Sequence, residues 1–293
     1  MGNSPSHLKN QSPPSSEKPT RFDPKRIYPA LVFVPLFYLL TQHLHPMFFF
    51  GLILIVSCLA MWEFYGLTFL DEDRKQRSLV GLSCGVILLL SLQSSDWLNF
   101  ETAIMIILFI LIGYQITVVR LGARSLSHLP FTLFGIVYIA FTLGHLLLLR
   151  KLPDGTFLVF FVLLVSWSGD ATAYYVGRRF GSRPLARVLS PKKTIEGLVG
   201  GLITVPLIAW GASLWFLPLL TLSDCIVLGL TLTLVGTFGD LSESVFKRQA
   251  GVKDSGNLIP GHGGFLDRID SLLLTVPTFY YYMLMIKGSV PIS

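Results

Sequence analysis

Apolar runs of about 20 residues recur along the chain, separated by short polar or glycine- and proline-containing breaks. They lie at about 27–44, 47–69, 79–94, 100–119, 130–149, 156–176, 197–217, 222–239 and 270–287, of which the third is the shortest. A helix of roughly 20 apolar residues crosses a hydrocarbon layer about 30 Å thick. The runs lack the in-out alternation of barrel strands, and a helix pairs its own backbone groups in lipid. The pattern predicts an all-α polytopic integral membrane protein with about nine transmembrane helices.

Composition agrees with a chain solvated mainly by lipid. Of the 293 residues, 52% are hydrophobic and 14% are charged, whereas soluble domains contain about 25% charged residues. The formal charge of +6 comes from basic residues between the apolar runs, which form no continuous stripe and therefore do not indicate nucleic-acid binding. Cys58, Cys84 and Cys225 stand singly inside apolar runs, so neither a zinc site nor a disulfide framework is expected.

The polar segments divide the chain into three parts. Residues 1–26 are rich in Ser, Pro and Lys and are expected to form a disordered cytoplasmic tail. Residues 27–155 hold the N-terminal transmembrane helices, and residues 156–293 hold a catalytic transmembrane region. No cleavable signal peptide is expected, because the first apolar run continues as a long span.

Basic residues set the predicted orientation. With nine spans and a cytoplasmic N-terminus, every Lys and Arg except Arg150, Lys151 and Lys287 faces the cytoplasm. The loops that follow the sixth and eighth runs then lie on the same, cytoplasmic side. A bacterial inner membrane fits this short chain, and an organelle membrane remains open.

Charged residues within or beside the apolar runs mark candidate functional positions. Glu63, near the end of the second run, is open to an interfacial and to a functional role. Asp170 lies inside the sixth run, where a carboxylate costs about 2.5–3.5 kcal/mol and is usually paired or lines a wet cavity. Ser190, Lys192 and Lys193 precede the seventh run, where a helix N-terminus favours a phosphate. A basic loop that contacts anionic lipid head groups is the equally weighted alternative.

The segment from 240 to 270 concentrates carboxylates between two spans. If the eighth helix continues, Asp240, Glu243 and Lys247 share one face at positions i, i+3 and i+7. Asp267 and Asp270 open the ninth span three residues apart. Carboxylates at these two helix ends would supply the oxygen ligands that Mg²⁺ prefers, together with phosphates and water.

A glycine-rich turn separates the two carboxylate groups. Gly263 and Gly264 permit the backbone to approach a phosphate closely, since glycine tolerates positive φ and has no side chain. His262 is open to three roles: a hydrogen-bond donor to a phosphate, an acid or base, and a structural imidazole.

At these residues the chain resembles the CDP-diacylglycerol synthase (phosphatidate cytidylyltransferase) family. The matching run reads Ser244-Val245-Phe246-Lys247-Arg248, Lys253-Asp254, Ile259-Pro260-Gly261-His262-Gly263-Gly264, Asp267-Arg268 and Asp270. The segments Ser168-Gly169-Asp170 and 190–197 also resemble the family, so the resemblance extends over roughly residues 166–287.

The resemblance implies transfer of CMP from CTP to phosphatidate, with release of pyrophosphate and formation of CDP-diacylglycerol. It implies Mg²⁺ held by Asp240 and Asp267, with a second cation left open. The catalytic residues would be Asp240, Asp267, Lys247, Arg248 and Lys253, and the substrate-binding residues Ser190, Lys192, Lys193, His262, Gly263, Gly264 and Arg268. Asp170, Asp254 and Asp270 would ligate a second cation or orient the basic residues. The expected partners are CTP, phosphatidate and membrane lipids, without nucleic acid, and a homodimer is left open.

Three alternatives remain from the sequence. A CTP-dependent lipid kinase would transfer the γ-phosphate to a polyprenol and release CDP. A cation-coupled transporter also carries intramembrane carboxylates and glycine-broken helices, although no repeated half is evident here. A non-catalytic assembly factor would tolerate changes at Asp240 and Asp267.

Overall fold

Helices make up most of the computed structural model, which describes residues 38–39, 41–43, 45–69, 73–94, 97–120, 128–256 and 263–288. The N-terminal helices are α2 (Pro46–Thr68), α3 (Arg74–Gln93), α4 (Phe100–Arg120), α5 (Leu129–Gly135), η1 (Ile136–Phe141) and α6 (Thr142–Arg150). The later elements are α7 (Gly155–Phe180), β1 (Pro184–Ala186), β2 (Ser190–Thr194), α8 (Ile195–Trp215), α9 (Leu222–Gln249), η2 (Leu266–Arg268) and α10 (Asp270–Met285).

Seven helices in the described ranges are long and apolar enough to cross a membrane. They comprise α2, α3, α4, the continuous helix 129–150, α7, α8 and α9. The prediction of an all-α integral membrane protein is therefore confirmed, whereas the count of about nine spans is not. The ninth predicted span is α10, which has 16 residues and extends roughly 24 Å. The predicted tail 1–26 and most of the first predicted span, 27–44, lie outside the described residues.

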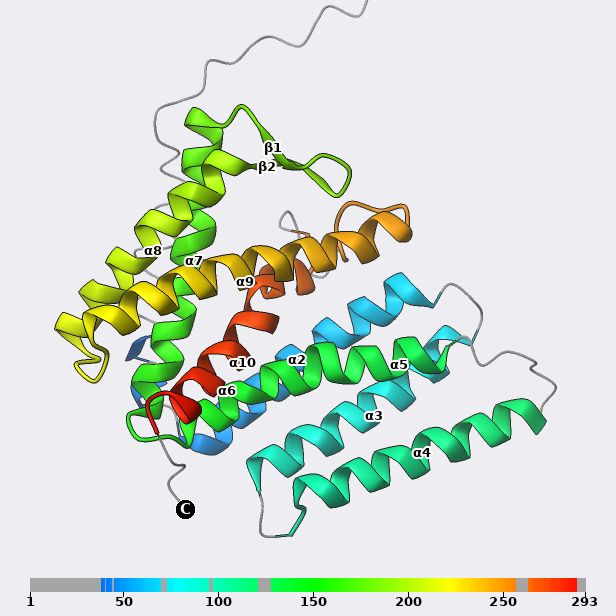
Figure 1. The fold of residues 1–293 in the computed structure, drawn as a ribbon. Coiled ribbons are helices and arrows are strands. Elements are labelled where there is room, and N and C mark those ends of the chain that lie inside the picture. The colour runs from blue at the N-terminus through cyan, green and yellow to red at the C-terminus, as the bar shows by residue number, and fades with distance from the viewer. Residues whose placement is uncertain are drawn as a thin grey trace, which may run out of the picture.

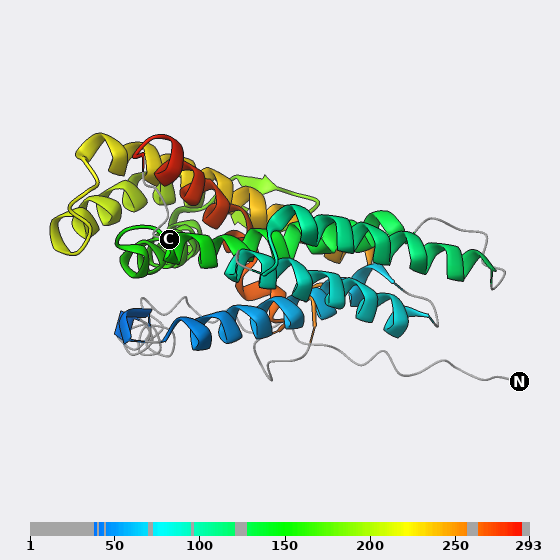
Figure 2. The same cartoon turned by 90° about the horizontal axis from the view of Figure 1, so that it is seen from below.

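Two groups of helices lie side by side (Figure 1). Helices α7, α8, α9 and α10 pack successively on one another, and α10 also contacts α6. Helices α2 and α3 pack with the helix that contains α5, η1 and α6, and α4 lies at the outer edge against α3, as the view from below also shows (Figure 2). The two groups meet where α6 contacts α7 and α10, and also where α9 and η2 contact α2, which brings the C-terminal end of α2 to the polar segment after α9.

Small residues allow close approach in the N-terminal group. The Tyr65 ring on α2 is fully buried, and its hydroxyl donates a hydrogen bond to the Thr132 carbonyl at 2.9 Å. A Cβ atom at Gly81 or Gly135 would collide with this ring. These glycines therefore permit α2, α3 and α5 to pack around one tyrosine, as small residues commonly do between membrane helices.

A π-helical turn interrupts the fifth predicted span. Helices α5 and α6 form one rod, 129–150, in which η1 has π-helical hydrogen bonding. Such turns often occur at functional positions. Here η1 carries Tyr138, whose buried hydroxyl points toward α9 and lies 3.4 Å from the Gly239 carbonyl.

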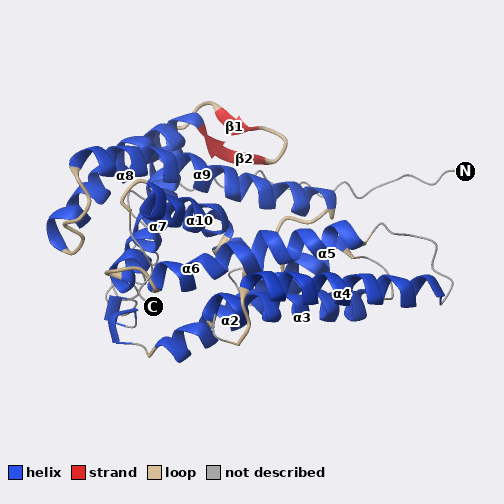
Figure 3. Cartoon of the chain, turned by 60° about the horizontal axis from the view of Figure 1, so that its bottom comes forward, coloured by secondary structure: helices blue, strands red, loops and turns tan. Residues whose placement is uncertain are grey.

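A β-hairpin between α7 and α8 was not predicted. Strands β1 and β2 pair antiparallel, with Pro184 opposite Thr194 and Ala186 opposite Ser190. Glu196 holds the base of the hairpin by accepting hydrogen bonds from Ser182 Oγ at 2.7 Å and from the Arg183 backbone N–H. The hairpin projects from the ends of α7 and α8 beside α9 (Figure 3).

The start of α8 is closed by its own residues. Thr194 is the N-cap residue, and its side chain accepts the Gly197 N–H at 3.1 Å. Gly197 and Gly200 face α7, where a Cβ atom would meet the Ala173 carbonyl or the Val176 side chain. These two glycines therefore serve helix packing, and one of the N–H groups expected to bind an anion is already paired.

Candidate functional site

Three aspartates from three helices gather on one side of the hairpin. Asp170 lies on α7, Asp240 on α9 and Asp270 at the first position of α10, and the three carboxylates interact electrostatically. Asp170 is exposed, and its Oδ2 accepts a hydrogen bond from Ser271 Oγ at 2.9 Å. Asp270 is buried. The chain thus brings three carboxylates close to one another at the hairpin side of α7, α9 and α10.

An ion pair joins the hairpin to this group. Lys193 on β2 pairs with Asp240 on α9, and each side chain is about one quarter exposed. The pair links the segment between α7 and α8 with the segment before α10. Both residues were predicted site residues, and the structure brings them into direct contact.

A second lysine lies between two carboxylates near the end of α9. Lys247 Nζ donates to Glu243 Oε2 at 2.8 Å and pairs with Asp267 Oδ1. The Glu243 side chain is fully buried, and that of Lys247 is 9% exposed. The predicted face of Asp240, Glu243 and Lys247 is present on α9, but its lysine is engaged in ion pairs inside the protein.

Asp267 receives hydrogen bonds on both carboxylate oxygens. Besides the contact of Lys247 with Oδ1, Oδ2 accepts the Ser255 N–H at 2.9 Å, the Gly264 N–H at 3.0 Å and Ser255 Oγ at 3.1 Å. Burial disfavours the charged form, but the Lys247 and backbone hydrogen bonds outweigh it and hold the pKa of Asp267 below its ordinary value. The carboxylate is therefore ionised and fixed at neutral pH.

Glu63 of α2 reaches the same segment from the other helical group. Its Oε1 accepts the Phe265 N–H at 2.9 Å, and its Oε2 accepts the Leu266 N–H at 2.8 Å and Ser255 Oγ at 2.9 Å. Glu63 is 4% exposed. The sequence had left its role open between interfacial and functional, and the structure places it beside the predicted site.

The remaining described site residues that were predicted lie mostly at the surface. Arg248 is exposed, and it donates from Nε to the Leu189 carbonyl at 3.1 Å and from Nη1 to the Val252 carbonyl at 3.0 Å. It therefore ties the tip of the hairpin to the end of α9. Ser190 is half-buried on β2, whereas Lys192, Lys253, Asp254 and Arg268 are exposed.

The glycine-rich turn is described in part. Gly263 has φ +81°, the left-handed region expected for glycine. A Cβ atom at Gly264 would collide with Ser255 Oγ, so this position has no room for a side chain. His262 lies outside the described residues.

The carboxylates suit Mg²⁺ by donor chemistry and charge. Within the described ranges, no three His, Cys, Asp or Glu side chains stand close enough to hold a metal ion by themselves. Mg²⁺ is commonly bound through one or two carboxylates, with substrate phosphates and water completing its shell. Asp240 and Asp267 are carboxylates of this kind, and in the structure each is paired with a lysine, Lys193 or Lys247, whose positive charge occupies the place of a cation.

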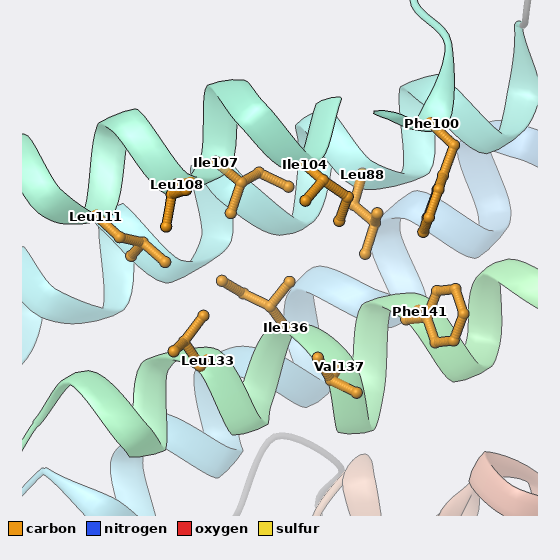
Figure 4. Close-up of a pocket in the computed structure, with 10 residues that line it drawn as sticks. All are labelled: Leu88, Phe100, Ile104, Ile107, Leu108, Leu111, Leu133, Ile136, Val137 and Phe141. Carbon is orange, nitrogen blue, oxygen red and sulfur yellow. The ribbon is translucent and has the colours of Figure 1, made fainter. Parts of the chain in front are cut away.

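An apolar pocket lies between α3, α4, α5 and η1 (Figure 4). It has a volume of about 230 Å³, and its lining includes Leu88, Phe100, Ile107, Leu133 and Phe141 without any polar side chain. Such a lining offers no partner to a nucleotide or a phosphate. The polar cluster is therefore the candidate site for charged ligands.

A model of the cytidylyltransferase family matches residues 24–286. The chain belongs to this family. Two relatives named phosphatidate cytidylyltransferase come from Staphylococcus saprophyticus, 37% identical over 66% of this chain and 73% of the relative, and from Staphylococcus aureus, 36% identical over 68% of this chain and 75% of the relative. A third of that name, from Haemophilus influenzae, is 45% identical over 44% of this chain and 46% of the relative.

Two residues beside the candidate site were not among the site residues predicted from the sequence, although Glu63 had been left open to a functional role. Tyr138 gave no signal in an apolar run, yet it contacts the Gly239 carbonyl and lies near Asp240, Glu243 and Asp270. Glu63 gave one signal, a carboxylate inside an otherwise apolar run, but its partners come from residues about 200 positions later. Long-range contacts of this kind cannot be derived from local spacing.

Proposed function

We propose that this protein is a phosphatidate cytidylyltransferase, which converts CTP and phosphatidate into CDP-diacylglycerol and pyrophosphate. Membership of the cytidylyltransferase family and the relatives of that name support the reaction. Two ion pairs, Lys193–Asp240 and Lys247–Asp267, are the observation that supports placing the reaction at this site. Their residues come from β2, α9 and η2, beside membrane-spanning helices. Such an arrangement suits a polyanionic nucleotide that must meet a lipid phosphate.

The reaction transfers a nucleotidyl group between phosphates. A phosphate oxygen of phosphatidate forms a bond to the α-phosphorus of CTP, while the bond from that phosphorus to the oxygen bridging to the β-phosphorus breaks. The electron pair leaves with pyrophosphate. Positioning and charge neutralisation dominate phosphoryl transfers, so the protein needs no nucleophilic side chain.

The basic residues divide into two roles. Lys192 and Lys253 are exposed around the cluster and are proposed to bind phosphate oxygens of CTP, together with Lys193 and Arg268. Lys247 is proposed to hold Asp267, because its ammonium group is buried between two carboxylates.

Arg248 is proposed to position the hairpin, because its guanidinium contacts two backbone carbonyls, those of Leu189 and Val252. Ser190 lies on the hairpin strand that Arg248 supports, next to the proposed phosphate-binding lysines.

Asp240 and Asp267 are proposed to hold Mg²⁺. Asp170, Asp254 and Asp270 are proposed either to bind a second cation or to orient an Arg or Lys side chain that binds phosphate. When bound, Mg²⁺ would neutralise phosphate charge and align the reacting groups. The chain itself fixes Asp267 through Ser255 and Gly264, so that this carboxylate needs little reorganisation when a ligand arrives.

The topology proposed for this enzyme has nine spans, with the N-terminus and the site facing the cytoplasm of a bacterial inner membrane. Support comes from the chain direction: α7 and α9 end at the site, whereas α8 and α10 begin there. Helix α9 has 28 residues and therefore extends roughly 42 Å, about 12 Å beyond a 30 Å hydrocarbon layer. Asp240, nine residues before the C-terminal end of α9, then lies near the membrane surface.

Product analysis tests the function. Detergent-purified protein is incubated with phosphatidate, CTP and Mg²⁺, and the lipid products are identified by mass spectrometry while pyrophosphate is quantified. Equal amounts of CDP-diacylglycerol and pyrophosphate, both abolished by a chelator, are expected. Release of CDP together with a phosphorylated lipid would instead establish a CTP-dependent lipid kinase. If neither CDP-diacylglycerol nor a phosphorylated lipid is formed, a transport or assembly role would be favoured.

A further inference from the structure

We infer that Glu63 is a positioning residue for the cytidylyl transfer proposed above: it fixes both flanks of the segment between α9 and η2 and thereby orients Asp267. The inference rests on the proposed reaction for its kinetic consequence, although the contact network stands independently of it. Glu63 lies near the C-terminal end of α2, in the helical group that otherwise contributes no carboxylate to the described cluster.

Glu63 contacts residues on each side of the glycine-rich segment. On the side of α9 it accepts Ser255 Oγ at 2.9 Å, and on the side of η2 it accepts the N–H groups of Phe265 at 2.9 Å and Leu266 at 2.8 Å. Ser255 and Leu266 are both buried. A single side chain from α2 therefore contacts both described flanks, at residue 255 and at residues 265–266.

Ser255 connects Glu63 to Asp267. The Ser255 hydroxyl lies 2.9 Å from Glu63 Oε2 and 3.1 Å from Asp267 Oδ2, and it carries one proton to share between them. The Ser255 and Gly264 N–H groups also donate to Asp267 Oδ2. Holding Ser255 and the chain at 264–266 in place therefore sets the orientation of the Asp267 carboxylate.

The contacts require a carboxylate at position 63. Every group that Glu63 contacts is a donor: two backbone N–H groups and one hydroxyl. A glutamine would turn an NH₂ group toward at least one of these donors and leave a buried N–H group unpaired.

Two glycines show how closely the backbone approaches Glu63. A Cβ atom at Gly256 would lie 2.5 Å from Glu63 Oε1, and one at Gly264 would lie 2.8 Å from Oε2. Side chains at these positions would displace the carboxylate. Position 264 therefore requires glycine because of its packing against Glu63, in addition to any approach of its backbone to a phosphate.

The test compares Glu63→Gln with the control Glu101→Gln, which changes an exposed glutamate in the first turn of α4. In metal-free full-length protein, hydrogen–deuterium exchange is expected to accelerate about tenfold or more at the amides of Phe265 and Leu266. Exchange in α8 is expected to stay unchanged in both variants. Unchanged exchange at 264–268 in Glu63→Gln would overturn the inference.

Kinetics supply the second readout. Partners that orient a metal ligand typically contribute about 10–100-fold to activity, so kcat of Glu63→Gln is expected to fall by that factor, while KM for phosphatidate stays within about threefold of wild type. Wild-type kcat despite faster exchange would mean a purely structural contact and would overturn the inference.

A milder variant covers the case in which Glu63→Gln does not fold. Ser255→Ala removes the shared hydroxyl while leaving its N–H in place, and a roughly threefold to tenfold fall in kcat is expected. Wild-type kcat in Ser255→Ala would break the proposed connection. If wild-type protein makes no CDP-diacylglycerol, the proposed function fails, whereas the exchange comparison still decides the role of Glu63 in ordering 264–266.

Discussion

Lys247 offers a sharp test of the ion pairs at the end of α9. Lys247→Met removes the ammonium group that lies between Glu243 and Asp267 and leaves the fully buried Glu243 carboxylate without a cation. Breaking a buried pair by removing one partner typically costs about 3–5 kcal/mol, because the remaining charge is uncompensated. At about 2–4 °C per kcal/mol for a large domain, the thermal midpoint is expected to fall by about 6 °C or more.

Thermal unfolding in detergent, without nucleotide or metal, measures this effect separately from substrate binding. Lys253→Met is the matched control, because Lys253 is exposed and surface changes usually stay within about 0.5 kcal/mol. Adding Glu243→Gln to Lys247→Met removes the buried carboxylate charge that has lost its cation, and is expected to recover part of the decrease in thermal midpoint. A midpoint of Lys247→Met within about 2 °C of wild type would refute the counterion role and return Lys247 to phosphate binding.

Three further predictions concern Asp267 and its surroundings. Asp267→Asn is expected to lower the rate of CTP-dependent lipid labelling by about 100-fold or more, and a rate within about threefold of wild type would contradict its role as a metal ligand. The pKa of Asp267 is lower in the folded protein than in the unfolded chain. The ionised Asp267 therefore stabilises the fold above the unfolded pKa of about 3.9, and this stabilisation is lost as pH falls through the folded pKa. The thermal midpoint of the wild-type protein should fall more between about pH 5 and pH 3 than that of Asp267→Asn. Gly264→Ala is expected to abolish activity through collision with Ser255, whereas Gly113→Ala, with open space around it, should leave activity unchanged; retained activity in Gly264→Ala would contradict the packing described.

The apolar runs of the sequence predicted most of the described helices, because a helix that crosses a membrane must be both long enough and apolar enough. The run at 79–94 became the 20-residue helix α3, and α9 continued past its apolar part to Gln249, as the face of Asp240, Glu243 and Lys247 required. The ninth span was less well predicted: α10 begins at Asp270 and has 16 residues. Apolarity alone does not set how long the helix of an apolar run will be.

The β-hairpin and the contacts between the two groups of helices could not be predicted from apolar runs and residue spacing. Strand β1 has three residues, too few for an alternating pattern, and the residues just before it are held by Glu196 at the start of α8. The roles of Lys247 and Glu63 depend on partners brought together by tertiary packing. Residue type and spacing indicated a charged site, whereas which charges pair with one another required the fold.

The most direct test of the central claim follows each phosphate of CTP. Purified protein in phosphatidate-containing micelles is incubated in parallel with α-labelled and γ-labelled CTP in the presence of Mg²⁺. Cytidylyl transfer predicts that the α-label enters the lipid fraction and that the γ-label appears in pyrophosphate. Entry of the γ-label into lipid, with the α-label remaining in CDP, would contradict the account.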